Sequence, residues 1–359
     1  MSRNAQAYRI RPAPFQSKFA GAALLALAAA GLACGAEPEP STVRPPQRAR
    51  VVIVEDARAT GTFVPKPEVV RSLVERGLRQ WTGRPTTTAA WLSLVSTNDF
   101  IGLKVYSAPG ATGGSRPEVA AAVASTLIAA GVPAGQIIVW DKHAADLRLA
   151  GFTALRERLG VRVESALDAG WDEKAAYDRS LIGSLVFGDL EFGRKGDNVG
   201  RKSHLSRLIT KTVTKHISIA PLLNHNQMGV CGHLQSLALG AADNTIRFEN
   251  HPAHLFEAVA ELYAMPELGD RVVLNITDAL LCQHEGEQRP LLHYSVALNQ
   301  LRFSSDPVAL DILSLEELQR QRRKAGFAAA KVSLAMFRNA SLLELGISEP
   351  ANIRIEWAK

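Results

Sequence analysis

Residues 100–141 read FIGLKVYSAPGATGGSRPEVAAAVASTLIAAGVPAGQIIVWD, and this stretch indicates the fold class of the protein. Two short apolar segments, residues 100–106 and 136–140, have the composition of strands that are buried on both faces. Between them lie a Gly-rich loop and a segment whose apolar side chains have the spacing of an amphipathic helix. A strand, a helix and a second strand in this order are typical of a right-handed crossover between parallel strands.

The alternation of strand and helix patterns continues on both sides of this stretch. A strand at residues 51–54 and a helix at residues 67–81 precede it. After it, the pattern predicts helices at residues 145–159, 253–264 and 307–324, a turn or helix at 228–239, strands at 161–164, 215–220, 271–276 and 299–303, and a closing helix and strand. We therefore expect an α/β protein with a mostly parallel sheet and helices on both faces, in three layers.

Composition and periodicity also predict the domain organisation of the chain. One α/β core domain is expected at residues 50–325, followed by a closing segment at residues 326–359. Residues 165–200 are rich in Gly and Asp and show no clear periodicity, so we expect an irregular insertion there.

Positive charge is concentrated near the start of the chain. The sequence has 41 Lys and Arg against 35 Asp and Glu, a formal net charge of +6. Residues 1–36 contain four of the basic residues and none of the acidic ones, which leaves 37 against 35, or +2, for the remainder. Because a nearly balanced chain lacks the electrostatic footprint of a nucleic-acid-binding protein, we expect no nucleic-acid partner.

The start of the chain has the composition of an export signal. Basic residues precede an Ala- and Leu-rich segment at residues 19–32, and small residues surround Cys34. The sequence Gly31-Leu-Ala-Cys34 resembles a bacterial lipoprotein box, in which Cys34 would be acylated, whereas cleavage before Glu37 would remove this cysteine. Either alternative predicts export to the periplasm or cell envelope, with a tether at residues 37–49 and membrane attachment only through a lipid at Cys34.

Cysteine content limits the cofactors that this chain can hold. Only Cys231 and Cys282 lie beyond the leader, so the chain lacks the four ligands of an iron–sulfur cluster. The pair could form a disulfide in an oxidising compartment, or the two thiols could be buried separately. No other cofactor or metal is assigned from the sequence.

Two charged residues in neighbouring predicted strands are candidates for chemistry. Lys104 lies inside the apolar strand Ile101-Gly-Leu-Lys-Val105, and Asp141 ends the next strand. A buried ammonium group requires a carboxylate or a bound anion, because an unpaired charge is costly in the protein interior. If the two strands are adjacent, both residues lie at the carboxyl edge of the sheet, where ligands bind in open α/β folds. A structural ion pair and a catalytic pair both remain open.

The loop Pro109-Gly-Ala-Thr-Gly-Gly114 joins the Lys104 strand to the next helix. Backbone N–H groups at Gly110, Gly113, Gly114 and Ser115 could bind an anion at the start of that helix. The loop lacks the Gly-Lys-Ser/Thr ending of a phosphate loop, so no nucleotide is implied, and a simple turn is the alternative. Ser115-Arg-Pro-Glu118 has the spacing of a capping box.

Histidines are crowded in the second half of the chain, where seven of the nine lie between His216 and His293. Their spacing matches no zinc signature, and a structural role is the alternative for each of them. His225 follows a buried strand and Asp278 follows another, so both are expected at the sheet edge with Lys104 and Asp141. Asp306-Pro307 is typical of a helix N-cap followed by proline at the first helical position.

Several of these segments together resemble the domain of unknown function 362 family. The matching segments are Ile101-Gly-Leu-Lys104 with the strand that ends at Asp141, Ile217-Ser-Ile-Ala-Pro221 with Asn224-His225, Leu234-Gln-Ser236 with Gly240-Ala-Ala-Asp-Asn244, Ile276-Thr-Asp278, and Ser305-Asp-Pro-Val-Ala-Leu-Asp311. The resemblance implies an α/β fold without a settled activity. Some members of the family carry a ferredoxin-type cluster domain, and the cysteine count of this sequence predicts a member without it.

The chain departs from that family at two cationic positions. Members usually have Lys before the residue matching His225, where this chain has Asn224, and Lys-Asn where it has Gln235-Ser236.

The sequence leaves two hypotheses about function. The first is an exported enzyme that acts on a small anionic metabolite, with His225 as acid or base beside Lys104, Asp141 and Asp278, and with the Gly-rich loop and Asn244 binding the ligand. The second is a non-catalytic ligand-binding or scaffold protein of the cell envelope.

Overall fold

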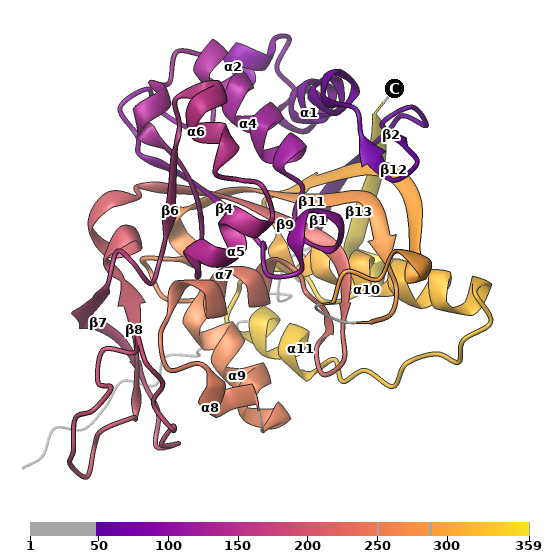
Figure 1. Cartoon of the computed structure of the whole chain (residues 1–359). Helices are drawn as coiled ribbons and strands as arrows, with labels where there is room; N and C mark the ends of the chain where they lie inside the picture. Colours follow the sequence, from indigo (N-terminus) through magenta and orange to yellow (C-terminus); the bar gives the residue numbers. More distant parts are fainter. Residues whose placement is uncertain (1–47, 250, 287–288, 359) are drawn as a thin grey trace, which may run out of the picture. The chain divides into compact units, whose positions relative to one another are not determined.

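The computed structural model describes residues 48–249, 251–286 and 289–358, which belong to one compact unit. Its central sheet is formed by β1 (Ala49–Glu55), β4 (Ile101–Val105), β5 (Ile137–Asp141), β6 (Arg162–Ser165), β9 (Lys215–His225), β10 (Gly229–Val230), β11 (Val272–Gln283), β12 (Ser295–Ser304) and β13 (Ile353–Ala358). The hydrogen-bonded order is β13-β1-β12-β11-β9-β4-β5-β6, with β10 paired to β9 (Figure 1). Strand β12 is antiparallel to both neighbours, β10 is antiparallel to β9, and the other pairs are parallel. The predicted mostly parallel sheet is confirmed.

Helices cover both faces of this sheet, as the sequence predicted (Figure 1). One layer contains α1 (Pro67–Thr82), α2 (Thr87–Leu92), α4 (Pro117–Ala129) and α6 (Ala154–Leu159), and the opposite layer contains α7 (His233–Ala241), α9 (Pro252–Tyr263), α10 (Pro307–Lys324) and α11 (Ala335–Leu342). The short helices α3 (Gly110–Gly113), α5 (Ala144–Leu149) and α8 (Ile246–Glu249) follow strands or α7, and β2 (Thr60–Gly61) pairs with β3 (Val64–Pro65). Two large apolar clusters fill the spaces between the sheet and these layers, which gives the three-layer fold.

Local sequence explains why the long helices begin and end where they do. Proline at the first position and a left-handed Gly83 bound α1, whose buried face includes Leu73 and Leu78. Helix α10 begins after Asp306, whose side chain accepts a hydrogen bond from the Ala309 N–H, so the N-cap prediction is confirmed.

Two predicted elements differ from the structure. The helix expected at residues 145–159 is two short helices, α5 and α6, because Gly151 between them has a left-handed φ of 89°. The insertion at residues 165–200 is not wholly irregular, since β7 (Trp171–Asp178) lies in it and pairs with β8 (Lys202–Ser206). Strand β7 is stabilised by antiparallel pairing with β8, which lies beyond the insertion. The residue pattern of the insertion alone therefore did not indicate a strand.

The leader, Cys34 and most of the tether lie outside the described residues. Among the described residues, none forms a helix that is both long and apolar enough to span a membrane. Cys231 and Cys282 are two buried thiols in different apolar clusters, which answers the disulfide question that the sequence left open.

Candidate functional site

Lys104 and Asp141 form a buried ion pair at the carboxyl edge of the sheet. Strands β4 and β5 are adjacent and parallel, and they place Lys104 Nζ 2.8 Å from Asp141 Oδ1. The ammonium group also donates to the Ser236 hydroxyl at 3.0 Å and to the Val105 carbonyl at 2.6 Å. All three of its N–H donors are therefore used within the protein.

The Asp141 carboxylate is equally well bonded. Ser107 donates its backbone N–H and its hydroxyl to Oδ2, and the Lys142 N–H donates to Oδ1. Burial alone would raise the pKa of Asp141, but Lys104 and the two donors of Ser107 lower it below its ordinary value. Burial lowers the pKa of Lys104, and Asp141 counteracts part of that change. The pair is thus a satisfied structural ion pair whose carboxylate also borders a cavity.

That cavity, the Asp141 cavity, has a volume of about 350 Å³ and lies between the ends of β4 and β5, helix α7 and the insertion. Ser236 and Gly240 of α7 line it together with Asp141, and a Cβ at Gly240 would lie 2.5 Å from Lys104 Cε. A glycine is needed at this position because α7 packs directly over the lysine. Apolar side chains of the insertion, including Trp171 and Phe187, complete the opposite wall.

Lys142 also lines the Asp141 cavity, and it was not among the site residues predicted from the sequence. Its Nζ donates to the Thr245 hydroxyl at 2.9 Å, and burial lowers the pKa of its ammonium group, opposed by the carboxylates of Asp189, Asp243 and Glu249. A lysine directly after a strand has no pattern that indicates a site. Its position in the cavity wall is what makes Lys142 a candidate site residue.

His225 lies in a second cavity, the His225 cavity, of about 410 Å³ at the end of β9. It is the last residue of β9 and does not follow the strand, because β9 is longer than predicted. Its Nδ1 lies 3.2 Å from the backbone N–H groups of Gln227 and Met228 and accepts from them, so a neutral ring carries its proton on Nε2. Gln235, Leu239 and Glu249 line both cavities, which therefore adjoin.

Asp278 is held apart from both cavities. The predicted strand ended at residue 276, but β11 continues to Gln283, so Asp278 lies inside it. Its Oδ1 is 3.0 Å from Arg116 Nη1, and its Oδ2 accepts from the Arg116 N–H at 2.9 Å. Asp278 therefore joins β11 to the start of α4 and is a structural residue in this arrangement.

The Gly-rich loop has the geometry of a tight turn. The N–H of Gly110 donates to the Ser107 carbonyl, that of Gly114 to Gly110, and that of Ser115 to Tyr106. Gly113 ends the short helix α3. These internal bonds use N–H groups that an anion would need, so the geometry favours the turn alternative.

The capping box predicted at residue 115 is wrong. Helix α4 has Arg116 at its N-cap without a side-chain cap, and proline follows as expected. The Ser115 hydroxyl instead accepts from the Tyr106 N–H at 2.8 Å and donates to the Ile219 carbonyl at 2.6 Å. A buried serine next to two strands satisfies strand backbone groups in place of the helix end.

Asn244 borders the Asp141 cavity, but its polar groups hold the insertion. Its side-chain amide donates to the carbonyls of Gly200 and Lys202, and its backbone N–H donates to Asp189. Within the described parts of the chain, no three His, Cys, Asp or Glu side chains gather in a way that could hold a metal ion.

Asp311, the last residue of the motif that begins at Ser305, caps a helix that is distant in sequence. Its two carboxylate oxygens accept from the N–H groups of His233 and Leu234 at the start of α7, whose own N-cap, Gly232, has no side chain. This contact orients α7, which carries Ser236 and Gly240 to the Asp141 cavity.

We expect Asp311→Ala to lower the free energy of unfolding by about 2 kcal/mol, because two buried N–H groups lose their acceptor. Urea unfolding at pH 8 measures this difference, with the exposed Asp270→Ala as the matched control. A loss no larger than that of the control would contradict the capping role.

Comparisons with known proteins add little to this geometry. No family model matches the chain, and no curated protein matches it. A crystal structure of a Thermotoga maritima protein, determined by the Northeast Structural Genomics Consortium, is similar over 73% of this chain, with 10% sequence identity and a TM-score of 0.41. The match spans 60% of that protein's chain. Function is therefore inferred from the site itself.

Proposed function

We propose that the protein binds a small polar molecule in the Asp141 and His225 cavities at the carboxyl edge of the sheet. The observation that carries this proposal is Gln235, which lines both cavities and is only 5% exposed. Its Oε1 accepts no hydrogen bond from any described residue. A buried acceptor without a donor costs about 1–3 kcal/mol, and an N–H or O–H group of a ligand would remove that cost.

The charges around the Asp141 cavity favour a ligand rich in hydrogen-bond donors. Asp141, Asp146, Asp189 and Glu249 line it, against the cation Lys142 and the imidazole of His143. Lys104 neutralises Asp141, but the other carboxylates still outnumber the one lysine. We therefore propose a neutral polyhydroxy compound or an amine as the ligand class, in place of the small anion expected from the sequence.

Binding is favoured over catalysis because two of the predicted catalytic residues bond to other protein groups. Lys104 donates all its N–H groups to protein acceptors, and Asp278 lies in a separate ion pair. An enzyme remains the second candidate because Lys142 borders the cavity with a pKa lowered by burial, and a less basic amine is suited to general base catalysis. Turnover that is lost in Lys142→Met would establish this second candidate.

We further propose that the chain is an exported member of the domain of unknown function 362 family. Support comes from the leader at residues 1–36 and the five matching segments. The intact mass of the protein purified from its host distinguishes acylation at Cys34 from cleavage before Glu37. A mass that retains the whole leader would contradict export.

A direct test uses native mass spectrometry and calorimetry with glucose, myo-inositol, putrescine and spermidine, and with citrate and phosphate as anionic comparisons. We expect at least one polyol or amine to bind saturably and Gln235→Leu to weaken it about tenfold, the equivalent of one hydrogen bond. The exposed Gln80→Leu is the matched control and should bind like the wild type. Binding confined to citrate or phosphate, or unchanged in Gln235→Leu, would contradict the proposal.

A further inference from the structure

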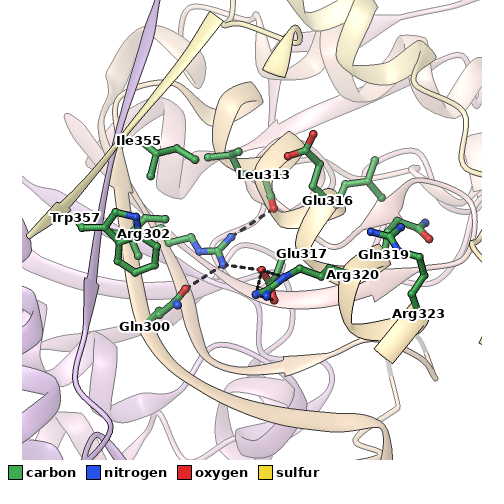
Figure 2. Close-up of a pocket in the computed structure, with 12 residues that line it drawn as sticks. Gln300, Arg302, Leu313, Glu316, Glu317, Gln319, Arg320, Arg323, Ile355 and Trp357 are labelled. Atoms are coloured by element: carbon green, nitrogen blue, oxygen red, sulfur yellow. Dashed lines mark hydrogen bonds and ion pairs between the residues drawn. The ribbon is translucent and has the colours of Figure 1, made fainter. Parts of the chain in front are cut away.

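A third cavity, the Arg302 cavity, lies at the other end of the sheet and has a volume of about 670 Å³. Its walls are formed by helix α10 and by strands β1, β12 and β13 (Figure 2). Its lining residues are Ile53, Gln300, Arg302, Leu313, Leu315, Glu316, Glu317, Gln319, Arg320, Arg323, Ile355 and Trp357. Because β13 and β6 are the opposite ends of the strand order, this cavity is distinct from the Asp141 cavity.

The sheet side of the Arg302 cavity is a row of paired residues. Trp357 of β13 pairs with Ile53 of β1, which pairs with Arg302 of β12. Ile53 and Arg302 are buried beneath α10, whereas Trp357 is 58% exposed and Ile355, on the same side of β13, is 43% exposed. The cavity therefore has a buried cationic end and an open apolar end formed by an indole and an isoleucine.

Arg302 is buried and shares its counter-ion, Glu317, with Arg320. It is 4% exposed, and its guanidinium donates to Gln300 Oε1 at 3.1 Å and to the Leu313 carbonyl at 3.4 Å (Figure 2). Its Nε has no acceptor among the described residues, and the distance from Nη2 to Glu317 Oε2 is 3.6 Å. A buried guanidinium that shares one carboxylate with a second arginine, and whose Nε has no acceptor among the described residues, would gain from a nearby anion.

Glu317 is already engaged by other partners. Arg320 donates to both of its oxygens at 2.7 Å, and Gln321 donates to Oε1 at 2.6 Å. Around the cavity there are three arginines, Arg302, Arg320 and Arg323, against Glu316 and Glu317, which leaves a net charge of +1. This balance matches a ligand with a single negative charge.

We propose that the Arg302 cavity binds an aromatic monocarboxylate, with its carboxylate at the arginines and its ring against Trp357 and Ile355. A carboxylate fits the planar donor array of a guanidinium, and a flat ring stacks on an exposed indole while shielding the isoleucine from water. The site is independent of the proposed function, because it shares no lining residue with the other two cavities.

The test is a titration with 2-naphthoate followed by the indole N–H resonances of the five tryptophans. The Trp357 resonance is assigned by its loss in Trp357→Phe. We expect 2-naphthoate to shift this resonance saturably and neutral 2-naphthamide to bind at least about tenfold more weakly, because the charged contact is lost. Trp357→Ala, at an exposed position, and Arg302→Lys should each weaken the binding of 2-naphthoate about tenfold, measured by calorimetry.

Matched variants separate this site from the others. Arg148→Gln removes an exposed arginine elsewhere, and Gln235→Leu changes the other cavities, so both should bind 2-naphthoate like the wild type. Equal affinity for 2-naphthamide, or unchanged affinity in both Trp357→Ala and Arg302→Lys, would overturn the proposal. A Trp357 resonance that shifts with protein concentration and not with 2-naphthoate would assign the face to self-association and would also overturn it.

Discussion

Lys104→Met is expected to lower the free energy of unfolding by about 3–5 kcal/mol, the range for breaking a buried ion pair from one side. The substitution leaves the Asp141 carboxylate buried with the donors of Ser107 and Lys142 but without its counter-ion. It also removes the contact between the lysine and the Ser236 hydroxyl of α7. Urea unfolding at pH 7 measures the loss.

Two further variants make this prediction specific. Lys324→Met replaces an exposed lysine at the end of α10 and should change the free energy of unfolding by less than about 0.5 kcal/mol. The double variant Lys104→Met, Asp141→Asn should recover part of the loss, because it removes the unpaired carboxylate as well. A double variant that is as unstable as the sum of the single variants would show that the pair does not couple.

The second large effect is a loss of stability in acid that comes from His233. This ring is fully buried, with Nδ1 2.8 Å from the Ser218 hydroxyl and Nε2 3.0 Å from the Thr277 hydroxyl, and burial lowers its pKa from 6.5 to about 3. Between these two pKa values the unfolded chain binds a proton that the folded protein does not. Stability from His233 is therefore present above pH 6.5 and is lost as the pH falls toward 3. The expected loss from pH 7 to pH 5 is about 2 kcal/mol.

The variant His233→Gln isolates this contribution. The measurement is the difference between wild type and variant in the slope of unfolding free energy against pH, from urea unfolding between pH 5 and 7. Burial also lowers the pKa of His216 to about 3, so His216 lowers the free energy of unfolding in acid in both the wild type and the variant. Burial raises the pKa of Asp311 to about 7, so protonation of Asp311 increases the free energy of unfolding as the pH falls. This contribution is also the same in the wild type and the variant. Equal slopes would contradict a neutral, buried His233.

Local patterns were sufficient where a feature depends on neighbours in sequence. Helix α10 has the predicted bounds, because Asp306 caps it and proline occupies its first turn. Predictions from local patterns were wrong where distant segments bond to the same polar group. Ser115 bonds to the backbone of Tyr106, which directly follows β4, and of Ile219 in β9, and does not cap the helix that follows it. Likewise, Asp278 lies within a strand because β11 is extended by pairing with β9 and β12.

The candidate site shows the same division. A lysine inside an apolar strand predicted a carboxylate partner, and the adjacency of β4 and β5 supplies Asp141. The sequence could not show that all the donors of this lysine would be used. Nor could it identify Gln235, since an amide on a helix has no distinctive pattern until two cavities and an unpaired oxygen surround it.

The α/β class, the three layers and the mostly parallel sheet could be predicted from the order of residues alone, because apolar periodicity indicates which faces of each segment are buried. It also predicted Lys104 and Asp141 at one edge of the sheet on the condition that their strands are adjacent, and the structure meets this condition. The packing of the layers determines that Gln235 Oε1 and Arg302 Nε have no hydrogen-bond partner among the described residues, and which cavities these side chains border. Hydrogen bonding and charge compensation depend on partners from distant parts of the chain, so their balance is set only when the layers have packed.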